Sequence, residues 1–240
     1  DIEAASSADV VVCNAPNYST AATSQHAVAL MLELCNRAGA HSESVHRGDW
    51  VKSEHFSYWK YEPRELASMT VGIIGFGTIG RRVAAVLQAF GARILASART
   101  QKDTPDDPRF DWASNEEIFA TADLVSLHCP QTPENKGFVN RELIASMKPG
   151  SLLVNTARGG LIDEEDLAEA LKDGHLGGAA LDVVDGEPMK ASCPLMGVPN
   201  CILTPHIAWA SQPARKKLLE ISVENVSAYL KGHPQNQVNR

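Results

Sequence analysis

The sequence predicts an α/β fold built on a doubly wound parallel sheet. Short apolar runs alternate with helix-like segments from residue 70 to residue 204, which is typical of parallel strands joined by right-handed crossovers, with helices on both faces. A glycine pattern, GFGTIG at 75–80, lies between one such run and one amphipathic segment. The 240 residues suffice for one large domain or two small ones.

The composition limits the classes of partner that the chain is expected to bind and the cell compartment in which it is expected to work. A formal net charge of −7, spread along the chain, argues against a nucleic-acid or membrane surface. No apolar run approaches the roughly 20 residues of a membrane span, and we see no signal peptide. Five cysteines without a C-x-x-C pair indicate reduced thiols, so we expect a cytoplasmic protein without disulfides. The histidine spacings are not those of a zinc site, and we expect no metal.

The first 66 residues combine regular and irregular segments. Val10–Cys13 predicts a short strand closed by a turn at 14–17. A helix should begin near Thr23 or Ser24 and end at about Arg37; its apolar face is broad enough to indicate burial on two sides, between domains or between subunits. The stretch 48–66 is irregular and rich in aromatic residues, which favours covering a partner surface.

The functional prediction depends on the segment 69–91. Val71–Phe76 has the pattern of a buried parallel strand, and the apolar residues that follow predict one helix face, ended by Gly91: Ile79, Val83, Val86, Leu87 and Phe90. In the turn between them, Gly75 allows a tight bend, Gly77 lets the backbone approach a pyrophosphate, and Gly80 lets the helix pack against the strand. The helix N-terminus then faces the phosphates. This context predicts a Rossmann dinucleotide site; the alternative is a packing turn in another α/β protein.

The remaining chain continues the alternation. Strands are expected over 93–97, 124–128, 151–155, 179–184 and 201–204. Ser114, Asn140 and Asp163 are expected to cap the helices that lie between strands. A last helix should span 213–230, with Leu219, Val223, Val226 and Leu230 on one stripe.

Three polar residues follow the ends of different strands. Because ligands of a doubly wound sheet lie beyond the carboxyl ends of its strands, Arg158, Glu187 and His206 are candidate catalytic residues. A guanidinium can bind a carboxylate and polarise the adjacent carbonyl, and an imidazolium supported by a carboxylate can deliver a proton. Taken singly, each has a structural interpretation: an ion pair with a helix acid, a solvated turn residue and a cap. Together with the glycine pattern, they favour a carbonyl-reducing site.

At these positions the chain resembles the D-isomer-specific 2-hydroxyacid dehydrogenase family. The resemblance rests on 75–80, on MKPGSLLVNTARGG at 147–160, on Asp182–Pro188 and on Thr204–His206, and it covers nearly the whole chain. PHIAWAS at 205–211, Tyr18–Thr20 and Phe56–Trp59 are most similar to the hydroxypyruvate and glyoxylate reductase (glycerate dehydrogenase) branch.

The resemblance implies roles for individual residues. Arg158 would bind the substrate carboxylate and carbonyl, His206 would be the acid/base assisted by Glu187, and Asp182 would hold the nicotinamide carboxamide. The substrate would be a small 2-oxo acid, and the protein a homodimer. Further residues implied to line the cofactor are Phe76, Thr78, Ile79, His128, Cys129, Pro130, Thr156, Ala157 and Ala208.

The end of the second predicted strand bears on cofactor choice. Members that prefer NAD carry an acidic residue there, whereas this chain has Ser97, Ala98, Arg99 and Thr100, with Ala98 at the acidic position. A carboxylate would repel a 2′-phosphate and an arginine would pair with it, so we expect NADP(H) to be preferred over NAD(H). The alternative is that Arg99 is a surface residue and the pocket accepts either.

The resemblance also implies the domain organisation. Residues 24–210 would form the dinucleotide-binding domain, and 1–23 and 211–240 would be parts of a partial flavodoxin-like substrate domain. Family members carry a longer N-terminal segment, so we expect this chain to be N-terminally truncated. It should bind cofactor yet turn over poorly, since one wall of the water-excluding cleft would be missing.

Two other interpretations stay open. A nucleotide-sensing binding protein, like the C-terminal binding protein corepressors, would keep the same arginine, glutamate and histidine, although the acidic charge disfavours it. A formate or phosphite dehydrogenase of related fold is the catalytic alternative. The formate enzymes carry glutamine where Glu187 stands, which argues against that one.

Overall fold

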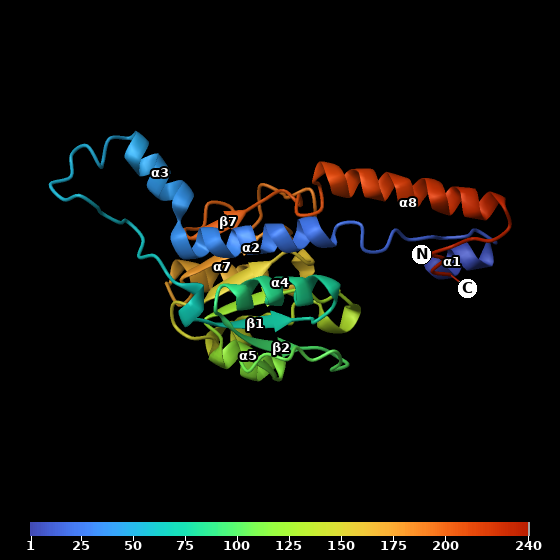
Figure 1. Ribbon diagram of the computed structural model, residues 1–240, viewed down its shortest axis with the longest axis horizontal. Helices are drawn as coiled ribbons and strands as arrows, with labels where there is room; N and C mark the ends of the chain where they lie inside the picture. The colour runs from blue at the N-terminus through green and yellow to red at the C-terminus, as the bar shows by residue number, and fades with distance from the viewer. Residues whose placement is uncertain (240) are drawn as a thin grey trace.

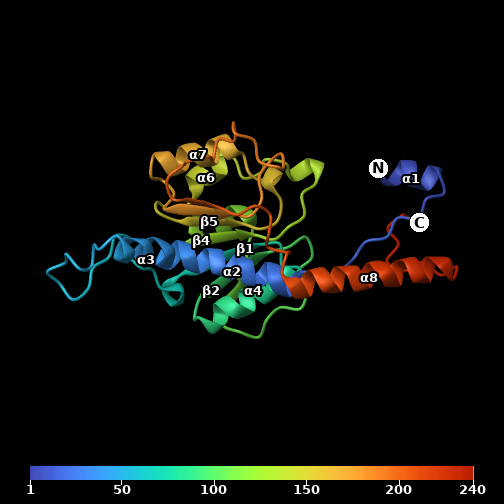
Figure 2. The same cartoon turned by 90° about the horizontal axis from the view of Figure 1, so that it is seen from above.

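The computed structural model describes residues 1–239, and its centre is a seven-stranded parallel sheet between two layers of helices (Figures 1 and 2). The strands are β1 (Thr70–Ile74), β2 (Arg93–Ser97), β3 (Phe110–Trp112), β4 (Leu124–Leu127), β5 (Leu152–Asn155), β6 (Gly178–Leu181) and β7 (Cys201–Leu203). Their spatial order is β3-β2-β1-β4-β5-β6-β7. The order reverses between β1 and β4, which is the point where a doubly wound sheet opens a ligand crevice. The predicted fold class is confirmed.

The strand register places the functional strand ends in one row. Ile74, the last residue of β1, is opposite Ser97 of β2 and Leu127 of β4. Leu127 is opposite Asn155, and Asn155 is opposite Leu181. The segments that leave β1, β4, β5 and β6 therefore start from the same edge of the sheet.

Each face of the sheet carries its own apolar core. Helices α2 (Thr20–Asn36) and α4 (Thr78–Ala89) cover one face, and α5 (Asn115–Thr121), α6 (Arg141–Ser146) and α7 (Glu164–Lys172) cover the other (Figure 2). The predicted caps of the second layer are confirmed: Ser114, Asn140 and Asp163 each accept hydrogen bonds from first-turn amides. Among the described residues, no helix is long and apolar enough to cross a membrane.

Helix α2 begins three residues before the predicted start, and its broad apolar face is buried within this chain. One side packs on α4 and the other on β5 and β6. Arg37 ends the helix in a left-handed conformation, with φ of 48°. In α4, by contrast, the predicted apolar stripe is partly wrong: Val83 and Leu87 are buried, but Val86 and Phe90 are exposed. The face against the sheet is completed by the small residues Gly80 and Ala84.

Two parts of the chain project from this body at opposite ends of the molecule (Figure 1). At one end, α3 (Ala38–His46) and the irregular stretch 47–65 form an arm that returns to β1 through a short 3₁₀ turn at Leu66–Ser68. At the other end, α8 (Gln212–Leu230) runs outward beside the segment that leads from α1 (Ile2–Ser7). The predicted stripe of α8 is exposed along its length: Leu219, Val223, Val226 and Leu230.

The predicted strand at Val10–Cys13 is wrong. The segment is extended but makes only an isolated antiparallel bridge, between Cys13 and Gln237, next to a bond from Val238 N to Val12 O (2.9 Å). A strand needs a continuous neighbour to form a ladder, and the described residues offer only this short C-terminal stretch.

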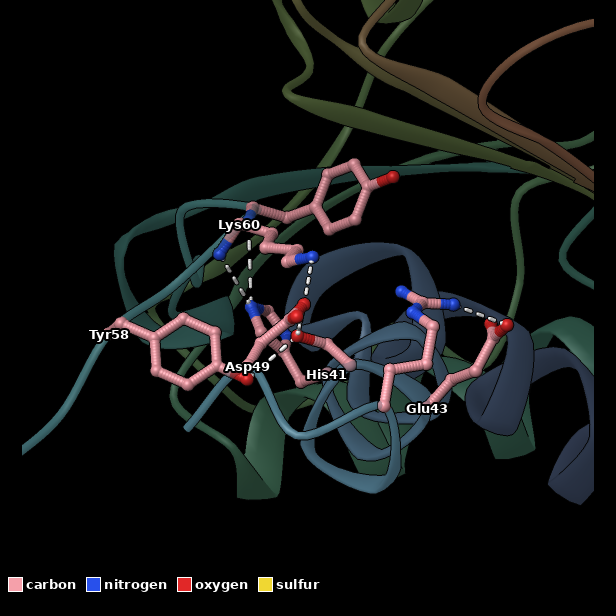
Figure 3. A network of polar contacts seen from close by, with 8 residues as sticks. His41, Glu43, Asp49, Tyr58 and Lys60 are labelled. Atoms are coloured by element: carbon pink, nitrogen blue, oxygen red, sulfur yellow. Dashed lines mark hydrogen bonds and ion pairs between the residues drawn. The ribbon is translucent and has the colours of Figure 1, made fainter. Parts of the chain in front are cut away.

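The arm is held together by polar contacts rather than by an apolar core (Figure 3). The Ser44 hydroxyl is buried and donates to Asp49 Oδ2 (2.9 Å), while Tyr58 Oη lies 2.7 Å from it. Lys60 forms an ion pair with the same aspartate. His41 Nε2 accepts from the Lys60 amide (3.1 Å) and joins the two sides of the arm at its base. The irregular conformation expected for 48–66 is confirmed.

Candidate active site

The three glycines of the turn after β1 differ in what a side chain would meet. Gly75 has φ of +97°, and a Cβ there would lie 2.6 Å from the Cys129 amide nitrogen. At Gly80 a Cβ would overlap the Gly75 carbonyl oxygen, so the helix could not approach the strand as closely. At Gly77, which precedes α4, a Cβ would meet nothing within 4 Å. The turn therefore has a tight bend, a close packing contact and one open position at a helix N-terminus.

A cavity of about 520 Å³ lies beyond the strand ends next to this turn. It brings together nine of the residues singled out from the sequence: Ile79, His128, Cys129, Pro130, Thr156, Ala157, Arg158, His206 and Ala208. Tyr18, Ser19, Thr23, Gln131 and Trp209 also line it. Glu187 and Asp182 line a neighbouring, mostly apolar hollow, and His206 lines both. His206 thus stands between the cavity and its supporting carboxylates.

The segment after β5 is shaped by Asn155, whose side chain is buried. Its Oδ1 accepts from the Ala157 amide (2.9 Å) and its Nδ2 donates to the Arg158 carbonyl (2.8 Å). A Cβ on Gly159 would overlap the Val184 carbonyl, so this turn packs directly on the segment that follows β6. Asn155 and Gly159 together fix the point from which the Arg158 side chain leaves.

The Arg158 side chain is exposed at the cavity. Nη1 donates to the Ala157 carbonyl (2.6 Å), and among the described residues the guanidinium forms no ion pair. A guanidinium without a carboxylate partner is available to bind an anionic ligand.

His206 forms a close pair with Glu187: Nδ1 lies 2.5 Å from Oε2. The other carboxylate oxygen accepts from the Val184 amide (3.2 Å), which orients the glutamate. His206 has φ of 53°, a conformation uncommon for a residue with a side chain, and its amide is held by the Asp182 carbonyl (2.8 Å). Because Nδ1 is engaged, Nε2 is the ring nitrogen left to face a substrate.

Asp182 is buried and anchors the segment that carries His206. Its carboxylate accepts from Thr204 Oγ1 (2.5 Å), Ile207 N (2.9 Å) and Ala208 N (2.7 Å). Burial acts to raise the pKa of Asp182, but these bonds and a contact with His26 lower it by more, so the pKa lies below its usual value. The carboxylate is therefore charged, and it fixes the path of the backbone from 204 to 208.

His26 of α2 completes this network and was missed by the sequence reasoning. Its Nε2 lies 3.0 Å from Thr204 Oγ1 and 3.4 Å from Asp182 Oδ1. The single Thr204 hydroxyl hydrogen goes to Asp182, so Thr204 accepts from His26, which must carry a proton on Nε2. Nearby, Tyr18 and Trp209 make an edge-on contact with ring centroids 6.3 Å apart. No local pattern marks His26, because α2 meets the 204–209 segment only in the folded chain.

Two polar side chains on the cavity wall differ in what they leave unsatisfied. Burial lowers the pKa of His128 to about 4, so its imidazole is neutral, and Nε2 is hydrogen-bonded to Ser126 Oγ (2.9 Å). The Thr156 hydroxyl is buried and has no hydrogen-bond partner among the residues described. An open position at Gly77 and an unpaired hydroxyl at Thr156 fit the binding of a dinucleotide along this edge.

The last residue of β2 and the residues that follow it lie outside the cavity. The Ser97 hydroxyl donates to Asn115 Oδ1 (2.6 Å), and the Ser97 carbonyl accepts from the Gly75 amide (3.0 Å). Arg99 and Thr100 are exposed, and within residues 1–239 neither side chain has a hydrogen bond or an ion pair. Their position beside the glycine turn is where the adenosine ribose of a dinucleotide lies in this fold.

No group of three histidine, cysteine, aspartate or glutamate side chains in the described chain could hold a metal ion. All five cysteines are free thiols. Burial raises the pKa of the Cys129 thiol at the cavity wall, so it remains protonated.

A parallel sheet with a dinucleotide turn at its switch point, and an arginine and a carboxylate-paired histidine at the same edge, defines a nicotinamide-dependent oxidoreductase. Residues 28–208 match the family model of the D-isomer specific 2-hydroxyacid dehydrogenase, NAD binding domain. The chain belongs to the D-isomer specific 2-hydroxyacid dehydrogenase family.

Individual relatives agree with this assignment. The chain is 41% identical to the hydroxypyruvate reductase of Blautia hydrogenotrophica, over 100% of this chain and 74% of that protein. It is also 41% identical to the glycerate dehydrogenase of Methylorubrum extorquens, over 99% of this chain and 74% of the relative. Among solved structures, the TT0316 protein of Thermus thermophilus superposes with a TM-score of 0.90 at 41% identity, covering 99% of this chain and 74% of that one.

Proposed function

We propose that this chain reduces a small 2-oxo acid, glyoxylate or hydroxypyruvate, to the corresponding 2-hydroxy acid, with NADPH as the preferred cofactor. The observation that carries the proposal is that Arg158 and His206, which follow different strands, line one cavity beside the glycine turn. The pairing of His206 with Glu187 gives the imidazole the partner that an acid/base catalyst needs.

The proposed mechanism assigns one task to each side chain. Arg158 binds the substrate carboxylate and polarises the neighbouring carbonyl. His206 donates a proton from Nε2 to the carbonyl oxygen, while Glu187 stabilises the imidazolium through Nδ1. A bound nicotinamide supplies the hydride. Asp182 keeps His206 in position through the backbone of 204–208.

The cofactor would lie from the exposed residues after β2 to the cavity. Arg99, with Thr100, would bind the 2′-phosphate, and the amides at 77–80 would bind the pyrophosphate. Thr156 Oγ1 would supply a hydrogen bond inside the cavity, where it has no partner among residues 1–239. Asp182, as an acceptor near the nicotinamide, would hold the carboxamide.

Residues 24–210 would form the dinucleotide-binding domain, and 1–23 and 211–240 would belong to the substrate domain. The projection of α1 and α8 away from the sheet supports this division (Figure 1).

The activity is tested by following NADPH oxidation with glyoxylate, hydroxypyruvate and pyruvate. We expect slow turnover with the first two, and a loss of at least about 100-fold in kcat/KM in Arg158→Ala and His206→Ala. Arg82→Ala is the matched control, since Arg82 is an exposed arginine outside the cavity. Cofactor binding without turnover of any 2-oxo acid would favour a nucleotide-sensing protein instead, and turnover with formate or phosphite a related dehydrogenase.

The cofactor preference has a separate test. The dissociation constants of NADPH and NADH, measured by nicotinamide fluorescence, should favour NADPH by about tenfold or more, because a phosphate–arginine pair contributes roughly 1.5–3 kcal/mol. Replacing Arg99 by Asp should reverse the order. A wild-type protein that binds NADH more tightly would contradict the preference.

We also propose that the protein is a homodimer in which the arm covers the second copy. Trp50, Phe56 and Trp59 are exposed on the arm, although the arm itself is held in shape by the Ser44–Asp49 contacts. Sedimentation velocity should give twice the mass of one chain; a monomer at micromolar concentration would contradict this.

A further inference from the structure

Arg81, in the first turn of α4, connects the glycine turn with the loop that follows β2. Its Nε donates to the Phe76 carbonyl (3.1 Å), within the glycine turn. Its other nitrogens reach the loop: Nη2 donates to the Lys102 carbonyl (3.1 Å), and Nη1 to the Asp103 carbonyl (3.2 Å) and carboxylate (3.1 Å). One side chain thus ties together two segments that lie beside the proposed adenosine site.

The inner end of this connection is rigid. The Arg81 guanidinium carbon lies 5.2 Å from the centroid of the Phe76 ring, and Phe76 is buried. Phe76, Phe110 and Trp112 form a trio with centroids 5.0 to 5.2 Å apart. The guanidinium of Arg81 therefore packs on a ring that is itself held in place by two other aromatic side chains.

The outer end is otherwise weakly held. Residues 98–107 contain no helix or strand, and Asp103 has φ of 51°. Apart from Arg81, the middle of the loop is anchored by Trp112 Nε1, which donates to Thr104 Oγ1 (2.9 Å). Arg99 and Thr100 precede these anchors and have exposed side chains. Between Ser97, which is held by Gly75 and Asn115, and Thr104, the hydrogen bonds from Arg81 are the only ones to the loop among residues 1–239.

We propose that Arg81 is a positioning residue for cofactor specificity: it holds the 98–107 loop so that Arg99 is presented to the 2′-phosphate of NADP(H). This rests on the proposed NADP(H) preference. Arg81 acts through the loop, since each of its three guanidinium nitrogens already donates to Phe76, Lys102 or Asp103.

Binding measurements test the specificity role. Arg81→Met removes the donors and keeps much of the side-chain length, Arg81→Lys keeps the charge but not the fork, and Arg82→Met is the matched control on the adjacent exposed arginine. We expect the dissociation constant of NADPH to rise about tenfold in Arg81→Met while that of NADH changes less than about twofold, with Arg81→Lys between and Arg82→Met unchanged. An equal loss for both cofactors would overturn the role.

The cofactor-free protein supplies a second readout. Trypsin cleaves after Arg99 and Lys102, and these cuts, followed by mass spectrometry, should be at least about fivefold faster in Arg81→Met than in wild type or Arg82→Met. Unchanged cleavage would overturn the positioning role even if NADPH is preferred. Equal NADPH and NADH affinities in the wild type would overturn the cofactor preference and the specificity role with it. Faster cleavage combined with a selective loss of NADPH supports the proposal.

Discussion

The sheet body and the two projections of this chain, the arm and α8, differ in where their large apolar side chains lie. In the body, large side chains such as Phe119 and Ile73 are fully buried, and polar groups at the strand ends, such as Asn155 and Asp182, are hydrogen-bonded. In the arm and in α8, large apolar side chains such as Phe56 (91% exposed) and Leu230 (78% exposed) face outward. A close-packed body cannot accommodate a change in side-chain volume without a loss of stability. The projections, in contrast, expose apolar surface that a single copy of the chain does not cover.

A substitution at Gly80 should cause the largest loss of stability in the sheet body. Gly80→Ala places a Cβ against the Gly75 carbonyl oxygen, and the backbone there has no room to yield. We expect a loss of about 3 kcal/mol of stability, at the upper end of the cost of overpacking, measured by urea unfolding.

Gly77→Ala is the matched control within the same turn. Its Cβ meets nothing within 4 Å, so stability should change by less than about 0.5 kcal/mol. Cofactor affinity should nevertheless fall, because the open position is where the pyrophosphate would approach. Equal stability losses in the two variants would contradict the geometry of the turn.

His128 should make the stability of the body depend on pH, with an effect smaller than that of Gly80→Ala. Its folded pKa of about 4 lies below the unfolded value of 6.5, so below pH 6.5 the unfolded chain binds a proton that the folded chain does not. Stability is unaffected above pH 6.5 and falls as the pH drops from 6.5 to 4. At about 1.4 kcal/mol per pH unit, reduced for the access of water to the ring edge, the loss should reach about 2 kcal/mol.

His128→Gln is the control for this effect. Glutamine can keep the hydrogen bond to Ser126 but does not titrate. The difference between the unfolding free energies of wild type and variant should therefore change across pH 6.5–4 and stay constant above. A parallel pH dependence in both proteins would show that other groups dominate.

The sequence predicts the body far better than the contacts across it. Strands such as β4 and β5 are short, mostly apolar and fully buried runs, and the caps Ser114, Asn140 and Asp163 follow from local chemistry. Strand β3 is missed because three residues with an exposed aspartate in the middle carry no periodic signal. Val10–Cys13 has the composition of a strand but only a short neighbour to pair with.

The same limit applies to the site. Arg158 and His206 can be predicted because polar residues that follow parallel strands meet at one edge. His26 reaches Thr204 through the crossing of α2 over the sheet, and no spacing along the chain encodes that crossing. Arg81 is a similar case, since its partners at 102 and 103 lie in a loop without regular structure.

Variants of the arm should have the smallest effect on the stability of a single chain, yet a large effect on its dimerisation. Phe56→Ser with Trp59→Ser removes two exposed rings that pack on little else in this copy, so the unfolding free energy of the dilute chain should change by less than about 0.5 kcal/mol. If the arm covers a second copy, the dimer dissociation constant should rise at least about tenfold, because buried aromatic anchors dominate interface energies. Ser44→Ala is the internal comparison: it breaks the contacts to Asp49 and Tyr58 and should loosen the whole arm, seen as faster amide exchange over 41–60. If the monomeric double variant unfolds at a temperature several degrees below that of wild type, these rings stabilise their own chain. The proposed difference between body and arm would then be wrong.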